Sequence, residues 1–311
     1  MSDAARLLAV QASPRKTGWT AQLLDAAVKG AGEVSGVEVD VVWLEDYTFR
    51  PCKSCFACIR SEAHRCVIAD DMGEGGALFD KLASANSMIV ACPVFMWGSS
   101  AMTRVFLERM YPFIWSGELS GMPFASISCA SNSGFQYHAS VDIARQVFNY
   151  SLRYMGCVPV HASYFDEGLE MAREKGSELA QAALADHRDG RSTLTDREKF
   201  TLYQEPWNVF ESYVDNLTNG SKLPEDSMAR KALEKKTFGR ERALEMLTRA
   251  DKKIQKAFEL LDAGKDVEAR DALSDGSALW TEATWREFLE EDVIGVTKPE
   301  AYRPPPEEED E

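Results

Sequence analysis

Residues 7–20 read LLAVQASPRKTGWT, an apolar run that passes through a short polar loop into a periodic helical pattern. The apolar run predicts a buried strand over 7–11. The spacing of Leu23, Leu24, Ala27 and Val28 predicts a helix over 20–31 with one apolar face. This order of strand, loop and helix is the opening of an α/β fold.

The same alternation continues to about residue 165. Further strands are predicted over 37–44, 87–92, 124–129 and 157–163, and helices over 71–85, 100–111 and 137–155. Alternating strands and helices predict a five-stranded parallel sheet with helices on both faces. Ligands of such sheets bind beyond the carboxyl ends of the strands, where the winding reverses.

Beyond residue 165 the strand signals almost vanish. We therefore expect a first domain over 1–165 and a mainly helical extension over 166–311 that ends in an acidic, disordered tail. Helices are predicted over 167–186, 198–217, 227–261 and 280–290. A stripe in the third of them joins Leu244, Leu247, Ile254, Phe258 and Leu261. The extension is interpreted as a layer packed on the first domain or on a second subunit, or as a partner-binding arm.

Composition excludes several classes of function. The 311 residues carry a formal net charge of −15, so the mean field repels nucleic acid and anionic membranes. We expect neither as a partner. No run of roughly 20 apolar residues is present to span a membrane, and no leader is evident, which favours a cytoplasmic protein.

Three loops follow predicted strands and should meet at one edge of the sheet. The first offers small hydroxyl residues, a glycine, cations and a helix N-terminus, which together suit a phosphate group. The second is apolar and aromatic, which suits a flat ring, and the third is small and polar. A phosphate end beside an aromatic wall suggests a mononucleotide such as FMN. The candidate ligands are Ser13, Arg15, Lys16, Thr17, Gly18 and Thr20; Pro93, Val94, Phe95, Met96, Trp97 and Gly98; and Ser131, Asn132, Ser133 and Gly134. Without the aromatic loop, the first could also be an ordinary capped turn.

Four of the seven cysteines crowd into a loop over 50–71. Cys52, Cys55, Cys58 and Cys66 have the spacing C-x2-C-x2-C-x7-C. Three closely stepped thiolates and a fourth from a short return suit a [4Fe-4S] cluster, as in bacterial ferredoxins. Two alternatives remain open: zinc, with His64 as a possible substitute ligand, and reduced or disulfide-forming thiols.

The cysteine loop is basic inside an acidic protein. Its residues 50–66 hold Arg50, Lys53, Arg60 and Arg65 but only one acid, Glu62. Cations would reduce the cost of burying an anionic cluster and would attract an acidic, ferredoxin-like redox partner. Alternatively, these are chance charges on a solvated loop.

Residues 1 to about 165 resemble the flavodoxin-like NAD(P)H-dependent FMN reductase superfamily, whose first loop commonly reads GSPRxxGNT and whose third strand ends in PVYW-like residues. Here residues 12–20 read ASPRKTGWT and residues 93–98 read PVFMWG. Ala12 stands for the usual Gly and Trp19 for the usual Asn. Within the superfamily, the cysteine motif, followed by residues 70–72 (DDM), resembles the iron-sulfur flavoprotein family.

That resemblance implies a flavodoxin-like fold, FMN and one [4Fe-4S] cluster per subunit, and assembly as a homodimer or homotetramer. It implies nothing for the chain after residue 165. NAD(P)H becomes a possible substrate.

Three functions remain in view. The first is an FMN-dependent oxidoreductase, linked to NAD(P)H or ferredoxin, that relays electrons between FMN and the cluster. The second is an NAD(P)H-dependent FMN or quinone reductase without a cluster, and the third is a non-catalytic flavin-binding sensor or assembly protein. No side-chain catalytic acid or base is expected, because the flavin supplies the reactivity.

Overall fold

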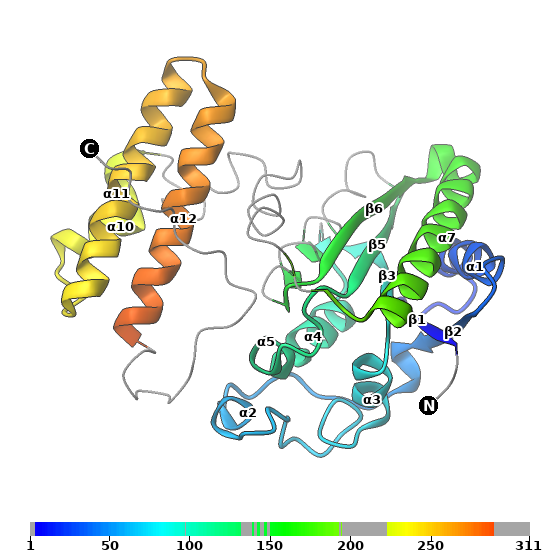
Figure 1. Ribbon diagram of the computed structural model, residues 1–311. Coiled ribbons are helices and arrows are strands. Elements are labelled where there is room, and N and C mark those ends of the chain that lie inside the picture. Colours follow the sequence, from blue (N-terminus) through cyan, green and yellow to red (C-terminus); the bar gives the residue numbers. More distant parts are fainter. Residues whose placement is uncertain are drawn as a thin grey trace. The chain divides into compact units, whose positions relative to one another are not determined.

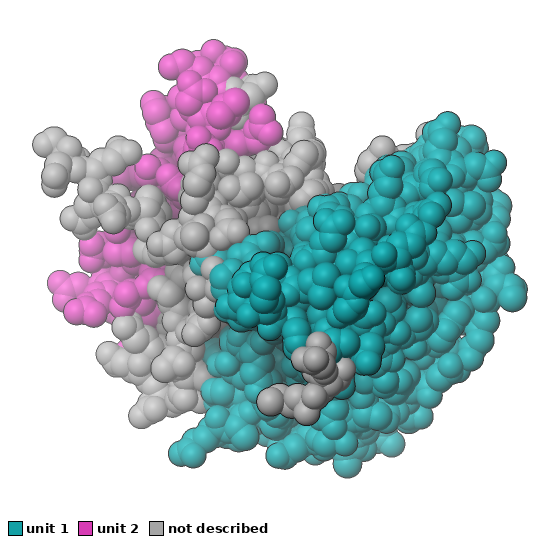
Figure 2. Space-filling view, turned by 45° about the vertical axis from the view of Figure 1, so that its right-hand side comes forward, with its two compact units in different colours: residues 1–194, 299–301 teal, residues 195–298, 302–311 magenta. Residues whose placement is uncertain are grey.

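The structure is a computed structural model, and it describes residues 4–96, 98–131, 139, 142–143, 146–147, 150–192, 194 and 223–288. The chain divides into two compact units, coloured separately in Figure 2. The first comprises Met1–Leu194 and Pro299–Ala301, and the second comprises Thr195–Lys298 and Tyr302–Glu311. Each unit is considered by itself.

The first unit is built on a parallel sheet in the strand order β2-β1-β3-β5-β6 (Figure 1). Its strands are β1 (Ala5–Gln11), β2 (Val37–Trp43), β3 (Ser87–Phe95), β5 (Pro123–Ala130) and β6 (Arg153–His161). A two-residue strand, β4 (Gly98–Ser99), returns antiparallel to the end of β3. The five parallel strands follow the flavodoxin order, and this confirms the predicted fold class.

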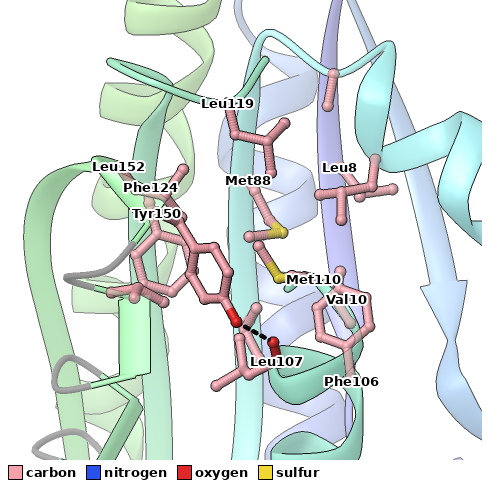
Figure 3. Close-up of a cluster of buried hydrophobic side chains, with 14 of the residues drawn as sticks. Leu8, Val10, Met88, Phe106, Leu107, Met110, Leu119, Phe124, Tyr150 and Leu152 are labelled. Atoms are coloured by element: carbon pink, nitrogen blue, oxygen red, sulfur yellow. Dashed lines mark hydrogen bonds between the residues drawn. The ribbon is translucent and has the colours of Figure 1, made fainter. Parts of the chain in front are cut away.

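Helices cover both faces of the sheet (Figure 1). One face carries α1 (Trp19–Gly32) and α7 (Phe165–Asp189), and the other carries α3 (Ala77–Ala83), α4 (Ala101–Arg109) and α5 (Pro112–Ser116). Alternate residues of one strand serve the two faces: Leu7 and Ala9 pack toward α1, whereas Leu8 and Val10 pack toward α4. Figure 3 shows this second core, in which the Tyr150 hydroxyl donates to the carbonyl oxygen of Leu107.

Two glycines let α1 and α7 approach closely. A Cβ atom at Gly30 would lie 1.9 Å from the carbonyl oxygen of Arg173, and one at Gly176 would lie 1.9 Å from that of Ala27. Neither position has room for a larger residue unless the helices separate. The N-terminus of α1, which faces the ligand edge of the sheet, therefore depends on α7 for its position.

Several predicted boundaries were wrong. The helix expected over 71–85 is only α3, because the preceding glycines are folded tightly: a Cβ at Gly73 would lie 1.9 Å from the Ile68 carbonyl oxygen. The helix over 100–111 ends at Arg109, and α5 follows it. The fifth strand begins at Arg153, so the preceding helix cannot reach residue 155 as predicted.

The second unit contains a helical hairpin with its own core. Its helices are α10 (Met228–Glu234), α11 (Glu241–Asp262) and α12 (Asp266–Phe288). The predicted stripe faces this core at Leu247 and Ile254, which are buried, whereas Leu261 is exposed. The single helix predicted over 227–261 is thus two helices, and α12 begins well before the predicted residue 280. The helix predicted over 198–217 and the acidic tail lie outside the described residues.

The domain boundary predicted near residue 165 stays a prediction. In the structure α7 packs on α1, and the first compact unit extends to Leu194. No helix in the described part of the chain is long and apolar enough to cross a membrane.

Candidate functional site

A cavity of about 490 Å³ lies at the carboxyl ends of β1, β3 and β5. Its size is within the usual range for small-molecule sites. We call it the strand-end cavity. Its walls are Ser13, Arg15, Thr17, Gly18, Trp19, Thr20 and Gln22 from the loop after β1 and the start of α1; Pro93, Val94 and Phe95 from β3; and Cys129, Ala130 and Ser131 from the end of β5.

The loop after β1 offers hydrogen-bond donors to the strand-end cavity, and none of its residues that line the cavity is acidic. The buried Ser13 accepts a hydrogen bond from the Arg15 N–H at 3.2 Å, and its own N–H donates to Gln11 Oε1 at 3.1 Å. Gly18 caps α1 without a side-chain capping bond, and the first turn contains no acidic residue. The N–H groups of that turn and the positive end of the helix dipole thus face the cavity mouth.

Part of the lining of the strand-end cavity is apolar. Trp19 is 45% exposed and Phe95 is 49% exposed, although both line the cavity. The Trp19 ring is supported by Phe165, with the ring centroids 5.8 Å apart. Burial raises the pKa of the Cys129 thiol to about 11, so this wall carries a neutral thiol at pH 7.

A second cavity, of about 300 Å³, is lined by all four loop cysteines. We call it the cysteine cavity. Its other walls are Lys53, Ser54, Phe56, Val67 and Ile68 from the same loop, and Glu108 and Tyr111 from the junction of α4 and α5. The loop itself forms only one short helix, α2 (Ala57–Arg60). The sequence motif is therefore gathered around one space.

Two sulfur atoms in the cysteine cavity accept hydrogen bonds from N–H groups. The backbone N–H of Ser54 donates to Cys52 Sγ at 3.3 Å, and Arg109 Nη2 donates to Cys66 Sγ at 3.4 Å. Burial, and then the nearby thiols of Cys66, Cys52 and Cys55, raise the pKa of Cys58 to about 11. Within the described ranges, no group of three or more His, Cys, Asp or Glu side chains is placed to hold a metal ion.

A buried ion pair closes the cysteine loop onto α4. The Arg109 and Asp70 side chains are 1% and 4% exposed, and two N–H groups of Arg109 bind the two Asp70 oxygens at 2.7 and 2.8 Å. Asp70 also accepts from the N–H groups of Arg50 and Met72, each at 3.0 Å. Burial alone would raise the pKa of Asp70, but the hydrogen bonds from Arg109 and these N–H groups hold it below its ordinary value.

Helix α4 connects the two cavities. At its first end the Ser100 hydroxyl donates to the Ala12 carbonyl oxygen at 3.0 Å, beside the loop after β1. At its last turn Glu108 accepts a hydrogen bond from the Cys52 N–H at 2.6 Å. A nine-residue helix is about 14 Å long. One helix thus contacts the loop after β1 at its first end and the cysteine loop at its last turn.

Comparison with known proteins identifies the family. Residues 5–168 match the family model described as NADPH-dependent FMN reductase. An iron-sulfur flavoprotein of Archaeoglobus fulgidus is 31% identical over 189 residues, which cover 57% of this chain and 80% of the relative. The chain belongs to the iron-sulfur flavoprotein family, within the NADPH-dependent FMN reductase superfamily. It is accordingly an FMN-dependent oxidoreductase, as predicted.

Other matches cover the same part of the chain. An iron-sulfur flavoprotein of Methanocaldococcus jannaschii is 26% identical over 191 residues, which cover 57% of this chain and 96% of that protein. A solved structure titled flavone reductase aligns with a TM-score of 0.45 and 16% identity, over 61% of this chain and 66% of that one.

The predicted FMN ligands of this family member fall into three groups. Nine line the strand-end cavity: Ser13, Arg15, Thr17, Gly18, Thr20, Pro93, Val94, Phe95 and Ser131. Three do not: Lys16 pairs with Asp46 instead, Met96 is 98% exposed at the β3–β4 turn, and Gly98 pairs with Phe95 in that hairpin. Trp97, Asn132, Ser133 and Gly134 lie outside the described residues. The assignment of all sixteen to FMN stays a prediction.

Of the other residues singled out in the cysteine loop, Lys53 alone lines the cysteine cavity. His64 uses Nδ1 in a 2.9 Å hydrogen bond with the Cys58 carbonyl oxygen, and it does not line the cysteine cavity. Arg65 forms an ion pair with Glu118 at 2.6 Å. Arg50, Lys53 and Arg60 are exposed.

Sequence reasoning missed the contribution of α4 to the cysteine site. Glu108, Arg109 and Tyr111 come about 50 residues after the cysteines, so spacing within the motif gives no sign of them. One signal was available: Arg109 lies three residues after the buried Phe106, and a charged residue at a core position of a helix requires a partner.

Proposed function

We propose that the four loop cysteines hold a [4Fe-4S] cluster and that this FMN-dependent oxidoreductase relays electrons between FMN and the cluster. The observation that supports the cluster most directly is that Cys52, Cys55, Cys58 and Cys66 line one cavity. Each thiolate of a cubane binds a different iron atom, so the sulfur atoms need to surround a space rather than converge on one ion. N–H groups directed at Cys52 and Cys66 suit anionic sulfur.

The residues of the strand-end cavity fit FMN. Its loop combines a helix N-terminus, buried hydroxyls at Ser13 and Thr20, and the exposed cation Arg15. The fully buried Gln11 accepts a hydrogen bond from the Ser13 N–H through Oε1, and this contact fixes the start of the loop.

In this proposal the chain binds and orients, and the flavin reacts. Bound FMN supplies the ability to accept a pair of electrons and release them singly. Ser13, Arg15, Thr17 and Thr20 would hold the phosphate. Pro93 and Phe95 would cover the ring and exclude water, and the protonated Cys129 thiol would place no negative charge beside it.

The electron partners are proposed from charge. Lys53 and Arg60 are exposed beside the cysteine cavity, and neither forms an ion pair within the described part of the chain. In a protein of net charge −15, this local positive surface favours an acidic, ferredoxin-like protein as the cluster's partner. NAD(P)H is the proposed substrate at the flavin, and a homodimer or homotetramer is the proposed assembly.

Anaerobic purification with joint metal and flavin analysis tests the proposal. We expect one FMN per subunit, together with four iron and four acid-labile sulfide ions. The absorption spectrum should show a broad iron-sulfur band beneath the flavin bands. Cys55→Ser should abolish the iron-sulfur absorption and keep FMN. Cys157→Ser is the matched control, because Cys157 lies on β6 outside both cavities, and it should keep both chromophores.

Three results would contradict the proposal in different ways. Zinc in place of iron and sulfide would indicate a metal site of another kind. NAD(P)H oxidation with added quinone by iron-free protein would support a cluster-free reductase. Colourless protein that does not take up added FMN would remove the flavin assignment.

A further inference from the structure

Arg109 is the largest fully buried side chain of the described residues. It lies in the last turn of α4, and its burial would cost several kcal/mol if the charge were unpaired. Asp70 compensates the charge. A guanidinium carries five N–H donors, so the use of the remaining ones shows whether the residue serves only this ion pair.

The N–H groups of Arg109 donate to two kinds of acceptor: oxygen atoms of the cysteine loop and one cysteine sulfur. Nη1 donates to Asp70 Oδ2 at 2.7 Å and to the Arg50 carbonyl oxygen at 2.6 Å. Nη2 donates to Asp70 Oδ1 at 2.8 Å and to Cys66 Sγ at 3.4 Å. Nε is buried and has no hydrogen-bond partner among the described residues. A residue that only neutralised Asp70 would have no need to contact a thiol.

We propose that Arg109 is a positioning residue that raises the reduction potential of the cluster through an N–H···S hydrogen bond to Cys66. The inference rests on the proposed function, because it needs a cluster on Cys66. Reduction adds negative charge that is shared by the ligand sulfurs, so a donor fixed on one sulfur stabilises the reduced form more than the oxidised form. Asp70 holds the guanidinium in one orientation and cancels its net charge. The remaining effect on the potential is therefore the short-range one of the N–H···S hydrogen bond.

The exposed cations of the same loop provide the contrast. Lys53 and Arg60 lie on the loop surface, and water and salt screen charges there. Neither donates a hydrogen bond to a cysteine sulfur in the part of the chain that the structure describes. If simple positive charge set the potential, these side chains would matter as much as Arg109.

A charge-matched double variant tests the inference. Asp70→Asn with Arg109→Met removes one negative and one positive charge, so the net charge is unchanged while the N–H donor to Cys66 is lost. The midpoint potential is measured on anaerobic holoprotein by redox titration followed by electron paramagnetic resonance. We expect a shift of about 59 mV or more to negative values, equivalent to a tenfold change in the one-electron equilibrium. Arg60→Gln is the control, and it should shift the potential much less.

A second variant covers the case in which the double variant does not retain its cluster. Arg109→Lys keeps the charge beside Asp70 but offers a compact ammonium in place of the fork. It should also lower the potential. Wild-type potential in either variant, or an equal shift in Arg60→Gln, would overturn the inference. Wild-type protein without iron and sulfide would instead overturn the proposed function, so the two failures are distinguishable.

Discussion

The two cavities of the first unit differ in what holds their walls. The strand-end cavity is formed by the ends of parallel strands, the start of α1 and the loop between β1 and α1, and that loop is anchored at both ends in regular elements. The cysteine cavity is formed by an irregular loop in which Ser54, Phe56 and His64 adopt positive φ angles of 47–56°. Such a loop is specified by a few buried polar contacts rather than by a ladder of hydrogen bonds.

The largest expected effect is on the ion pair that closes this loop. Asp70→Ala leaves Arg109 buried without its counter-charge, which should lower the free energy of unfolding of the first unit by about 3–5 kcal/mol. The measurement is hydrogen exchange against urea, with peptides from β1 and β3 as reporters. Asp46→Ala is the control, because its pair with Lys16 is half exposed, and it should cost less than about 1 kcal/mol. Equal costs would mean that the loop does not depend on Asp70.

The pH dependence sharpens the same contrast. The pKa of Asp70 is lower in the folded protein than its ordinary value of 3.8, so its stabilising contribution is complete above that value. It is lost as pH falls through the lower, folded pKa, because the unfolded chain then binds the proton more readily. Urea unfolding of metal-free protein below about pH 4 should therefore show a steeper loss of stability than in Asp70→Asn. Parallel curves for the two proteins would contradict this prediction.

In the strand-end cavity the corresponding change affects a ligand rather than the fold. Arg15→Gln removes an exposed cation that lines the cavity, so the stability of the protein should be unchanged. A charge-assisted hydrogen bond to phosphate contributes about 1.5–3 kcal/mol, and FMN affinity should fall at least tenfold. Fluorescence titration of apoprotein with FMN measures it. Riboflavin, which lacks the phosphate, should bind wild type and variant equally; a similar loss for both ligands would place Arg15 elsewhere.

A substitution remote from both cavities should weaken FMN binding without changing the iron content. Gly176→Ala places a Cβ atom 1.9 Å from the Ala27 carbonyl oxygen and should force α1 from α7, at a cost of about 1–3 kcal/mol. Because α1 carries the phosphate loop, FMN affinity should fall while iron content is kept. Gly32→Ala is the matched control, since a Cβ there meets nothing within 4 Å. Loss of iron in Gly176→Ala would show that the two cavities are not independent.

This contrast also explains what could be predicted from the sequence. The apolar runs of β1 and β3 are buried, and the change from an apolar run to a helical period of 3.6 places the loop after each strand at the ligand edge. The strand-end cavity could therefore be predicted from local patterns. The spacing of the cysteine motif predicted that the four thiols share one site, and they line one cavity. The spacing did not predict Glu108 and Arg109, which contact this loop from α4, about 50 residues further along the chain.

Contacts that the sequence does not encode occur near both cavities. Lys16 resembles a phosphate ligand by its place in the loop, yet Asp46, 30 residues later, binds its ammonium at 2.6 Å. The helix predicted over 71–85 included Gly73 and Gly76, whereas these glycines let the chain fold closely around Asp70. A tertiary contact decided each case, and no local pattern encodes it.

The smallest expected effect concerns Lys16. Its Nζ atom lies 2.6 Å from Asp46 and 5.6 Å from the centre of the Trp43 ring, and the side chain does not line the strand-end cavity. Lys16→Gln should therefore change FMN affinity less than twofold and stability by less than about 1 kcal/mol, as for other exposed ion pairs. Asp46→Asn should give the same small change, because it breaks the same pair from the other side. A tenfold loss of FMN affinity in Lys16→Gln alone would mean that the ammonium leaves Asp46 for the phosphate when FMN binds, and that the loop after β1 is as dependent on its side chains as the cysteine loop.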